Sequence, residues 1–384
     1  MKRLSILLIF LFLTGCAVSP SETREPTLPA TVTEAPQTVP TETTVPATTA
    51  PPDPIQELLD SMTIEERVGQ LFLARCNAES ALSDIQAYHL GGFVLFGEDF
   101  DGQTPGTLRQ TLSGYQSAAR IPMLLAVDEE GGTVTRISRY PAFRSQRFPS
   151  PRESFDDGGL TQALSNEEDI CQLLQSLGIN VNLGPVCDIS ADPNAFMYQR
   201  SLGQDAETTG QFVAGTVRLM NAYQIGSVLK HFPGYGDNAD THTGLAVDSR
   251  SLQELEANDL IPFAAGIEAG CGAVLVSHNI VQALDGDYPA SLSPAVHQYL
   301  RDTMGFDGVV MTDDLVMEAI TDRYGTGEAA VLAVQAGNDL LCSTDYAEQY
   351  NAVLSAVLDG RIDFDALNAS VTRILKWKQS LGLL

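Results

Sequence analysis

Ser227-Val228-Leu229-Lys230-His231 is a short apolar run that ends in two basic side chains. A strand with one face in water alternates apolar and polar residues. A strand of a parallel sheet is buried on both faces and is apolar without interruption. This run therefore predicts a buried strand of a parallel sheet, with Lys230 and His231 at its end.

Similar apolar runs recur along the chain, and segments with helical periodicity separate them. The eight predicted strands are Leu71–Ala74, Gly92–Phe96, Met123–Val127, Asn180–Asp188, Ser227–His231, Ala273–His278, Val309–Asp313 and Asp339–Cys342. Amphipathic stretches between them include Thr107–Ala119, Glu168–Leu177, Thr208–Tyr223 and Leu252–Ala269. Because strands and helices alternate, we expect parallel βαβ units, and eight repeats predict a single-domain α/β fold, the (β/α)8 TIM barrel. An open doubly wound sheet is the alternative, although the first βα turn lacks the G-x-G-x-x-G of its dinucleotide-binding form.

Charged and polar residues end four of these strands. They are Asp128 and Glu129 after the third, Lys230 and His231 in the fifth, His278 in the sixth, and Asp313 and Asp314 in the seventh. Any one of them is also explained as a cap or a solvated strand end. Together they predict an active site, because the carboxyl ends of barrel strands and the loops after them form that site in barrel enzymes.

The N-terminus predicts a lipoprotein. Lys2 and Arg3 precede an apolar run, Leu4–Leu13, that is shorter than the roughly 20 residues of a membrane span and fits a signal peptide. Leu13-Thr14-Gly15-Cys16 then resembles a bacterial lipobox with Cys16 as the lipidated residue. An ordinary signal peptide is the alternative. We expect residues 1–16 to be the signal segment and the protein to be extracytoplasmic and lipid-anchored to the bacterial cell membrane.

Residues 17–54 are rich in Thr and Pro and nearly free of large apolar side chains, so they cannot bury enough surface to offset the entropy of ordering. They predict a disordered tether, and residues 55–384 form the predicted catalytic domain.

Net charge and cysteine spacing exclude several functions. A formal charge of −27 argues against nucleic acid, which requires a basic face. Five cysteines remain after Cys16, and none forms a C-x-x-C pair. We therefore expect these cysteines to serve as small buried hydrophobic residues and not as a disulfide framework. No obligate protein partner is evident.

Two strands end in acidic residues, Asp128 and Glu129 for one and Asp313 and Asp314 for the other. Carboxylates around one active-site pocket suggest hydrolysis through a carboxylate nucleophile. The loop after Lys230 and His231 contains Asp240-Thr241-His242. In extended chain, residues two apart point the same way, so Asp240 can orient the His242 ring.

Four segments, in the same order along the chain, resemble glycoside hydrolase family 3 in its β-N-acetylglucosaminidase branch. Lys230–Gly234 (KHFPG) with Asp240-Thr241-His242 resembles the catalytic loop, and residues 128–136 (DEEGGTVTR) resemble the D-x-E-G-G-x-V-x-R segment. Residues 308–314 (GVVMTDD) resemble the nucleophile strand, and residues 200–205 (RSLGQD) resemble R-S-F-G-x-D.

The resemblance implies a role for each matching residue. Asp313 is the nucleophile, His242 is the general acid/base, and Asp240 is its partner. The implied substrate-binding residues are Asp128, Arg136, Arg200, Lys230, His231, His278 and Met317. The implied reaction is the removal of terminal β-linked N-acetylglucosamine from an amino-sugar glycan, such as a peptidoglycan fragment, without a metal or other cofactor. The family's β-glucosidase branch takes its acid/base from a second domain, which we do not expect in this chain.

Two positions depart from the family pattern. Tyr235 stands where the family usually has His, and Thr241 stands where it usually has Ser. Thr241 keeps the hydroxyl. Tyr235 replaces a polar ring beside the catalytic loop, which leaves the packing of that loop open.

Other functions remain as alternatives. A metal-dependent barrel hydrolase would use His231, His278 and Asp313, but such barrels commonly carry H-x-H after the first strand, where this chain has Arg75-Cys76-Asn77. A non-catalytic glycan-binding lipoprotein would not need both Asp313 and His242. A phosphorylase or β-glucosidase of the same family is not separated from the main interpretation by sequence.

Overall fold

In the computed structural model, residues 53–236 and 246–384 are described. Cys16, Asp240, Thr241 and His242 lie outside these ranges, as does almost all of the predicted tether. Residues 53–384 belong to one compact unit.

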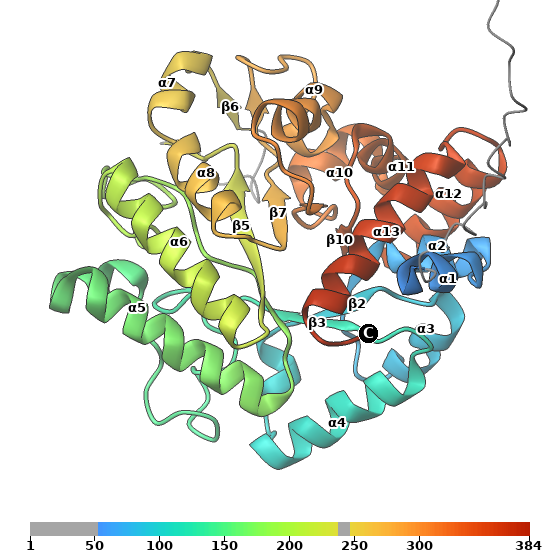
Figure 1. Ribbon diagram of the computed structural model, residues 1–384, viewed down its shortest axis with the longest axis horizontal. Coiled ribbons are helices and arrows are strands. Elements are labelled where there is room, and N and C mark those ends of the chain that lie inside the picture. Colours follow the sequence, from blue (N-terminus) through green and yellow to red (C-terminus); the bar gives the residue numbers. More distant parts are fainter. Residues whose placement is uncertain (1–52, 237–245) are drawn as a thin grey trace, which may run out of the picture. The chain divides into compact units, whose positions relative to one another are not determined.

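Parallel strands form the centre of this unit (Figure 1). The eight-stranded sheet has the order β10-β1-β2-β3-β4-β5-β7-β9. Its strands are β1 (Phe72–Arg75), β2 (Gly92–Leu95), β3 (Leu124–Val127), β4 (Val181–Asn182), β5 (Gly226–Phe232), β7 (Ala273–Val276), β9 (Val309–Thr312) and β10 (Leu341–Ser343). A parallel bridge between Met311 and Leu340 joins the two edges, so the sheet closes on itself. The predicted (β/α)8 TIM barrel is confirmed.

Helices surround the barrel in Figure 1. They are α1 (Pro54–Asp60), α2 (Ile64–Gln70), α3 (Ala81–Tyr88), α4 (Pro105–Ala118), α5 (Pro151–Leu177), α6 (Ala206–Ala222), α7 (Leu252–Ala257), α8 (Leu260–Glu268), α9 (Pro294–Gln298), α10 (Glu318–Tyr324), α11 (Thr326–Ala336), α12 (Tyr346–Leu358) and α13 (Phe364–Ser380). Local sequence explains several starts. The Ser150 hydroxyl and the Glu153 carboxylate form a capping box at α5, with Pro151 at the first helical position. None of the described helices is both long and apolar enough to cross a membrane.

The strands are buried along nearly their whole length, as an uninterrupted apolar pattern predicts. Two boundaries differ from prediction. The predicted strand Asn180–Asp188 has regular pairing only at Val181–Asn182, and Val186 adds an isolated bridge to Lys230. The predicted helix Leu252–Ala269 is divided into α7 and α8 around Asn258, whose backbone is not helical.

One aromatic side chain covers the amino ends of neighbouring strands. Trp377 of α13 lies against Gly226 of β5 and against Gly272, which precedes β7. A Cβ on Gly272 would lie 2.0 Å from the indole Nε1, and one on Gly226 would lie 2.8 Å from the ring carbon Cζ2. Glycine at both positions therefore allows this close approach.

All five cysteines of the described part, Cys76, Cys171, Cys187, Cys271 and Cys342, are buried and reduced. The prediction that they serve as small hydrophobic residues is confirmed, and burial raises the pKa of each thiol. Each thiol therefore stays protonated at neutral pH.

Lys378 of α13 is fully buried, and its Nζ donates a hydrogen bond of 2.6 Å to the side-chain oxygen of Gln70. Burial lowers the pKa of Lys378 from 10.5 to about 7. Below pH 7 the charge is buried at full cost. Between pH 7 and 10.5 the folded lysine is neutral while the unfolded one is charged, so the cost declines as pH rises.

Lys378→Met removes the cost of the buried charge but also loses the hydrogen bond to Gln70. We expect the net result to be a free energy of unfolding that is higher by roughly 3 kcal/mol at pH 6 and by much less at pH 10. Urea denaturation at several pH values measures this difference. Lys376→Met on the exposed side of the same helix is the matched control and should show no such pH dependence. Equal effects of both substitutions at every pH would contradict the assignment.

Candidate active site

The ends of β3, β5, β9 and β10 converge on one region of the barrel. Burial raises the pKa of the Cys342 thiol in β10, and the nearby carboxylates of Asp314, Asp313 and Asp128 raise it further. The Lys230 ammonium from β5 contacts the Asp128 carboxylate after β3 at 2.8 Å. The structure thus brings together strand-end residues that are up to 186 positions apart, the distance in sequence from Asp128 to Asp314.

A buried charge network lies at the centre of this region. The ammonium of Lys230 contacts carboxylate oxygens of Asp128 at 2.8 Å and of Glu130 at 2.6 Å. Arg200, on the loop before α6, donates to both oxygens of Glu130, from Nε at 2.9 Å and from Nη2 at 2.7 Å. Asp128 therefore shares its cation with Glu130, and Glu130 links two predicted substrate-binding residues.

Sequence reasoning did not assign Glu130 a role. Burial alone would raise the pKa of Glu130, but the adjacent Arg200 and Lys230 cations hold it well below its ordinary value. Burial would likewise lower the pKa of Lys230, and the Asp128 and Glu130 carboxylates raise it instead. Glu130 and Lys230 are consequently both charged at neutral pH.

His231 is held in one tautomer. Its Nε2 faces the Arg200 Nη2 at 3.2 Å, and its Nδ1 faces the carboxylate of Asp188 at 2.8 Å. Arg can only donate and a carboxylate only accepts, so Nε2 is the acceptor and Nδ1 carries the proton. The buried Asp188, another residue that sequence reasoning left without a role, therefore orients the imidazole.

Tyr235 packs in the interior. Its ring meets the His231 ring edge-on, with 5.2 Å between centroids, and also contacts Phe196. Its backbone N–H donates to Asp188 at 2.7 Å. Tyr235 thus adds apolar packing directly before residues 237–245. After that segment the chain continues in the small parallel sheet of β6 (Val247–Asp248) and β8 (Ile280–Val281).

The segment after Asp128 is pinned from inside by Glu129. The Glu129 carboxylate accepts from the backbone N–H groups of Arg136, Ile137 and Ser138 and from the Ser138 hydroxyl. Its side chain is fully buried, so it shapes the loop. Arg136 leaves this loop toward Asp128, with 3.6 Å between its Nη2 and the carboxylate.

Asp313 directly follows β9, and its backbone N–H donates to Val276 of β7 at 3.2 Å. One carboxylate oxygen of Asp313 accepts from the N–H of Asp314 at 2.9 Å, which orients the group. The Asp314 carboxylate instead turns to Thr344 and accepts from its hydroxyl at 2.5 Å and its N–H at 3.2 Å. The two adjacent aspartates therefore have different tasks.

His278 is fully buried, with Nδ1 2.7 Å from the Ser291 hydroxyl and Nε2 3.0 Å from the backbone oxygen of Asp314. This position favours support of the turn that carries Asp313 and Asp314 over direct contact with a sugar. Met317 is also buried and follows the same turn, directly before α10.

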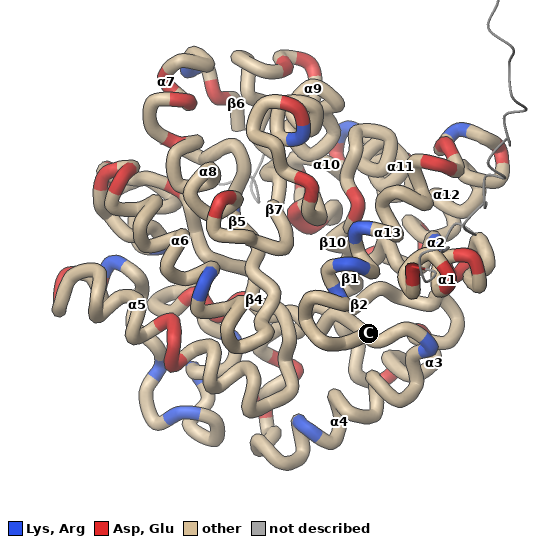
Figure 2. The backbone as a smooth tube through the Cα atoms, viewed as in Figure 1, with Lys and Arg blue, Asp and Glu red and all other residues tan. Residues whose placement is uncertain are grey.

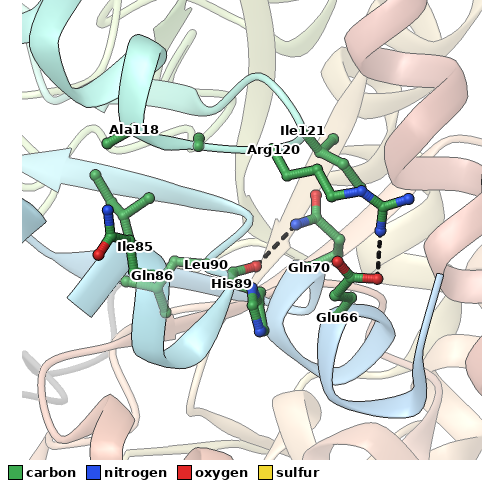
Figure 3. Close-up of a pocket in the computed structure, with 10 residues that line it drawn as sticks. Glu66, Gln70, Ile85, Gln86, His89, Leu90, Ala118, Arg120 and Ile121 are labelled. Carbon is green, nitrogen blue, oxygen red and sulfur yellow. Dashed lines mark hydrogen bonds and ion pairs between the residues drawn. The ribbon is translucent and has the colours of Figure 1, made fainter. Parts of the chain in front are cut away.

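Another hollow lies away from this region. A cavity of about 290 Å³ lies among α2, α3 and α4, beside Gln70, Leu90 and Ile121, which precede β1, β2 and β3. Figure 3 shows the Gln70 amide turned to the backbone oxygen of His89 and Arg120 paired with Glu66. This hollow is at the amino ends of the strands and is separate from the candidate site. Within residues 53–236 and 246–384, no cluster of three or more His, Cys, Asp or Glu side chains is placed to hold a metal ion.

Comparisons with known proteins identify the family of the chain. Residues 63–377 match the glycosyl hydrolase family 3 N-terminal domain. The chain is 31% identical over 366 residues to the β-hexosaminidase LpqI of Mycobacterium tuberculosis, covering 92% of each chain. It is 32% identical over 276 residues to a β-hexosaminidase of Xanthomonas campestris, covering 70% of this chain and 82% of that one.

A similar solved structure is a glycoside hydrolase family 3 β-N-acetylglucosaminidase from Paenibacillus sp. str. FPU-7, with a TM-score of 0.79 and 33% identity. The match covers 84% of this chain and 63% of that one. The solved M. tuberculosis LpqI gives a TM-score of 0.76 at 28% identity, over 84% of this chain and 96% of that one. The resemblance drawn from four sequence segments is confirmed, and the chain belongs to glycosyl hydrolase family 3.

Proposed function

We propose that the protein is a retaining, exo-acting β-N-acetylglucosaminidase that removes terminal β-linked N-acetylglucosamine from amino-sugar glycans. The observation that carries the proposal is the array of Asp128, Lys230, Glu130 and Arg200 at the strand ends, with Asp313 at the end of β9 in the same barrel. The names of its relatives, β-hexosaminidases and β-N-acetylglucosaminidases, support the choice of sugar.

The array suits a neutral sugar. Lys230 uses two of its three N–H donors on Asp128 and Glu130, which leaves one for a sugar hydroxyl. Asp128 is partly exposed and can accept a hydroxyl on the far side of the ring. Arg200, held by Glu130 and His231, is oriented to donate toward the ring or its acetamido group.

In the proposed reaction the Asp313 carboxylate attacks C1 of the sugar, and the bond to the leaving oxygen breaks while His242 gives that oxygen a proton. Water then attacks C1, His242 takes a proton from the water, and the ester bond to Asp313 breaks. Two displacements at C1 retain its configuration. Asp240 orients His242, and an imidazole avoids placing a second carboxylate beside the nucleophile.

The test of this function uses the full chain with nitrophenyl β-N-acetylglucosaminide and nitrophenyl β-glucoside. We expect kcat/KM to be at least about tenfold higher for the acetamido sugar. The released sugar should be free N-acetylglucosamine, whether or not inorganic phosphate is present in the assay. If the enzyme prefers the glucoside, the proposed substrate is wrong. If the product is a sugar phosphate, the enzyme is a phosphorylase.

His242→Ala should reveal the acid through its dependence on the leaving group. Loss of a positioned general acid typically costs about 10²–10⁴-fold. We expect a loss of this size with an N-acetylglucosamine disaccharide, because the departing oxygen needs a proton. The loss should be smaller with the nitrophenyl substrate, with a burst before slow deglycosylation. Asp240→Asn should show the same pattern more weakly. Equal losses for both leaving groups would remove His242 from the role.

We also propose that the protein is anchored outside the cytoplasm through a lipid on Cys16, with the residues after Cys16 as a tether. The lipobox Leu13-Thr14-Gly15-Cys16 behind a short apolar segment supports this. Cys16→Ser should leave an active enzyme that appears in the soluble fraction after cell fractionation. An unchanged membrane fraction for the variant would refute the anchor.

A further inference from the structure

A second cavity near the candidate site has a lining that the proposed reaction does not use. It has a volume of about 410 Å³ and is lined by Thr133, Thr135, Arg139 and Arg147. The lining combines two guanidinium groups and two hydroxyls with no carboxylate. Neither arginine forms an ion pair with a carboxylate in the described part of the chain, and both are exposed. The cavity is therefore a cationic concavity in a chain of net charge −27.

The segment that presents these side chains is fixed from within. Glu129 holds the backbone of residues 136–138 through its carboxylate. The Ser138 hydroxyl accepts from the N–H of Phe148 at 3.1 Å, and the N–H of Gly132 donates to the carbonyl of Phe148 at 2.9 Å. The backbone beside Arg139 and the backbone beside Arg147 are thereby tied together, and both side chains line the same cavity.

The cavity is linked to the proposed sugar site through a residue of its lining. Thr135 directly precedes Arg136, which contacts Asp128 at 3.6 Å and whose guanidinium carbon lies 5.6 Å from the centre of the Phe96 ring. The next residue, Gly97, lies beside Arg139, because a Cβ built on it would be in ordinary van der Waals contact with the Arg139 Nη1, at 3.4 Å. Arg136 and Arg139 therefore lie beside consecutive residues, Phe96 and Gly97.

We propose that this cavity binds an anionic oxygen group, a sulfate, phosphate or carboxylate, carried by the glycan that the enzyme hydrolyses. Arginine matches such groups because its fork donates two parallel hydrogen bonds, and threonine hydroxyls complete the donor set. Figure 2 shows Asp and Glu over many of the outer helices, so an anionic glycan is repelled by most of the surface. The cavity supplies a local exception, and its lining residue Thr135 directly precedes the predicted sugar-binding residue Arg136. The inference rests on the proposed function and adds to it a class of substrate.

An anionic group at either of two positions on a glycan would reach this cavity. One is the distal edge of the terminal sugar, which Asp128 and Arg136 would hold. The other is the leaving sugar, as with the lactyl carboxylate of N-acetylmuramic acid. The test therefore pairs nitrophenyl β-N-acetylglucosaminide with its 6-sulfate, and di-N-acetylchitobiose with the N-acetylglucosaminyl-N-acetylmuramic acid disaccharide. The full chain is compared with the double variant Arg139→Met/Arg147→Met.

We expect the double variant to lose tenfold or more of kcat/KM on the anionic member of one pair, mainly through KM, with less than a twofold change on both neutral substrates. The affected pair identifies the position of the anion. The control is Arg218→Met on the exposed side of α6, which removes a positive charge elsewhere and should change neither ratio. Unchanged ratios in the double variant, or equal changes in the control, would overturn the proposal.

A measurement without turnover keeps this test separate from the test of the enzymatic function. At constant ionic strength, replacing chloride by sulfate should raise the melting temperature of the unaltered chain more than that of the double variant. An equal rise in both overturns the anion site even if no glycoside is hydrolysed. Failure to hydrolyse the neutral nitrophenyl substrate, by contrast, overturns the proposed function.

Discussion

Asp313→Asn should abolish turnover while the barrel stays folded. The amide is nearly the same size as the carboxylate and can still accept the hydrogen bond from the N–H of Asp314. It cannot form the ester with C1, so kcat should fall by at least about 10⁴-fold, as when other enzymes lose their nucleophile. Steady-state kinetics and circular dichroism measure the two parts of this expectation.

Asp314→Asn is the matched control, because its environment accepts an amide. One oxygen of Asp314 accepts from the N–H groups of Val316 and Thr344, and an asparagine oxygen can do the same. The other oxygen accepts from the Thr344 hydroxyl, and an amide N–H there can donate to that hydroxyl instead. We therefore expect a loss of less than about 100-fold.

The nucleophile is identified directly by a 2-fluoro-N-acetylglucosamine analogue or a related slow substrate that accumulates the glycosyl-enzyme. Peptide mapping should find the label on Asp313. A label on Asp314, or comparable losses in the two variants, would assign the nucleophile to a different carboxylate and change the proposed mechanism.

The barrel and the strand-end residues could be predicted from sequence, and the reason is physical. Parallel strands are buried on both faces, so they appear as apolar runs, and a polar residue at the end of such a run stands out. That pattern alone predicts where Asp128, Lys230, His231 and Asp313 lie in the barrel. The boundaries were less predictable. Around Val181–Asn182 the apolar run continues, while ladder pairing ends after two residues.

The contacts between loops could not be read from sequence. Glu130 is the last of three consecutive acidic residues, and nothing local separates its role from that of Glu129. The difference arises because Arg200 folds against Glu130 while backbone N–H groups surround Glu129. Tyr235 is a similar case, since its ring packs against His231 and also against Phe196 from a loop about 40 residues earlier in the chain.

Glu130→Gln tests whether this network is as important as its burial implies. The substitution keeps the shape but removes the negative charge between Lys230 and Arg200, and it turns an amide N–H toward one of the two cations. Breaking a buried ion pair by removing one partner typically costs about 3–5 kcal/mol, because a buried charge loses its compensation. Asp128 still neutralises Lys230, so we expect the lower end, about 3 kcal/mol, in urea denaturation.

Activity should fall with stability but for a separable reason. Without Glu130, Arg200 keeps the His231 ring and the sulfur of Met197 as side-chain partners, and Lys230 shifts toward Asp128. Both cations then leave the positions proposed for sugar binding, so kcat/KM should fall by about 10²-fold or more, in line with other losses of substrate positioning. Kinetics at a temperature where the variant is fully folded separates this loss from unfolding.

Two further variants decide between a charge network and simple packing. Glu328→Gln breaks the exposed pair with Arg361 on the outer helices and should cost no more than about 1 kcal/mol. Adding Arg200→Met to Glu130→Gln removes the uncompensated cation and should recover part of the lost free energy of unfolding, while activity stays low. If Glu130→Gln costs no more than Glu328→Gln, or if the double variant is less stable than the single one, the network does not hold its cations by charge. The geometry at the strand ends would then have to come from the backbone alone.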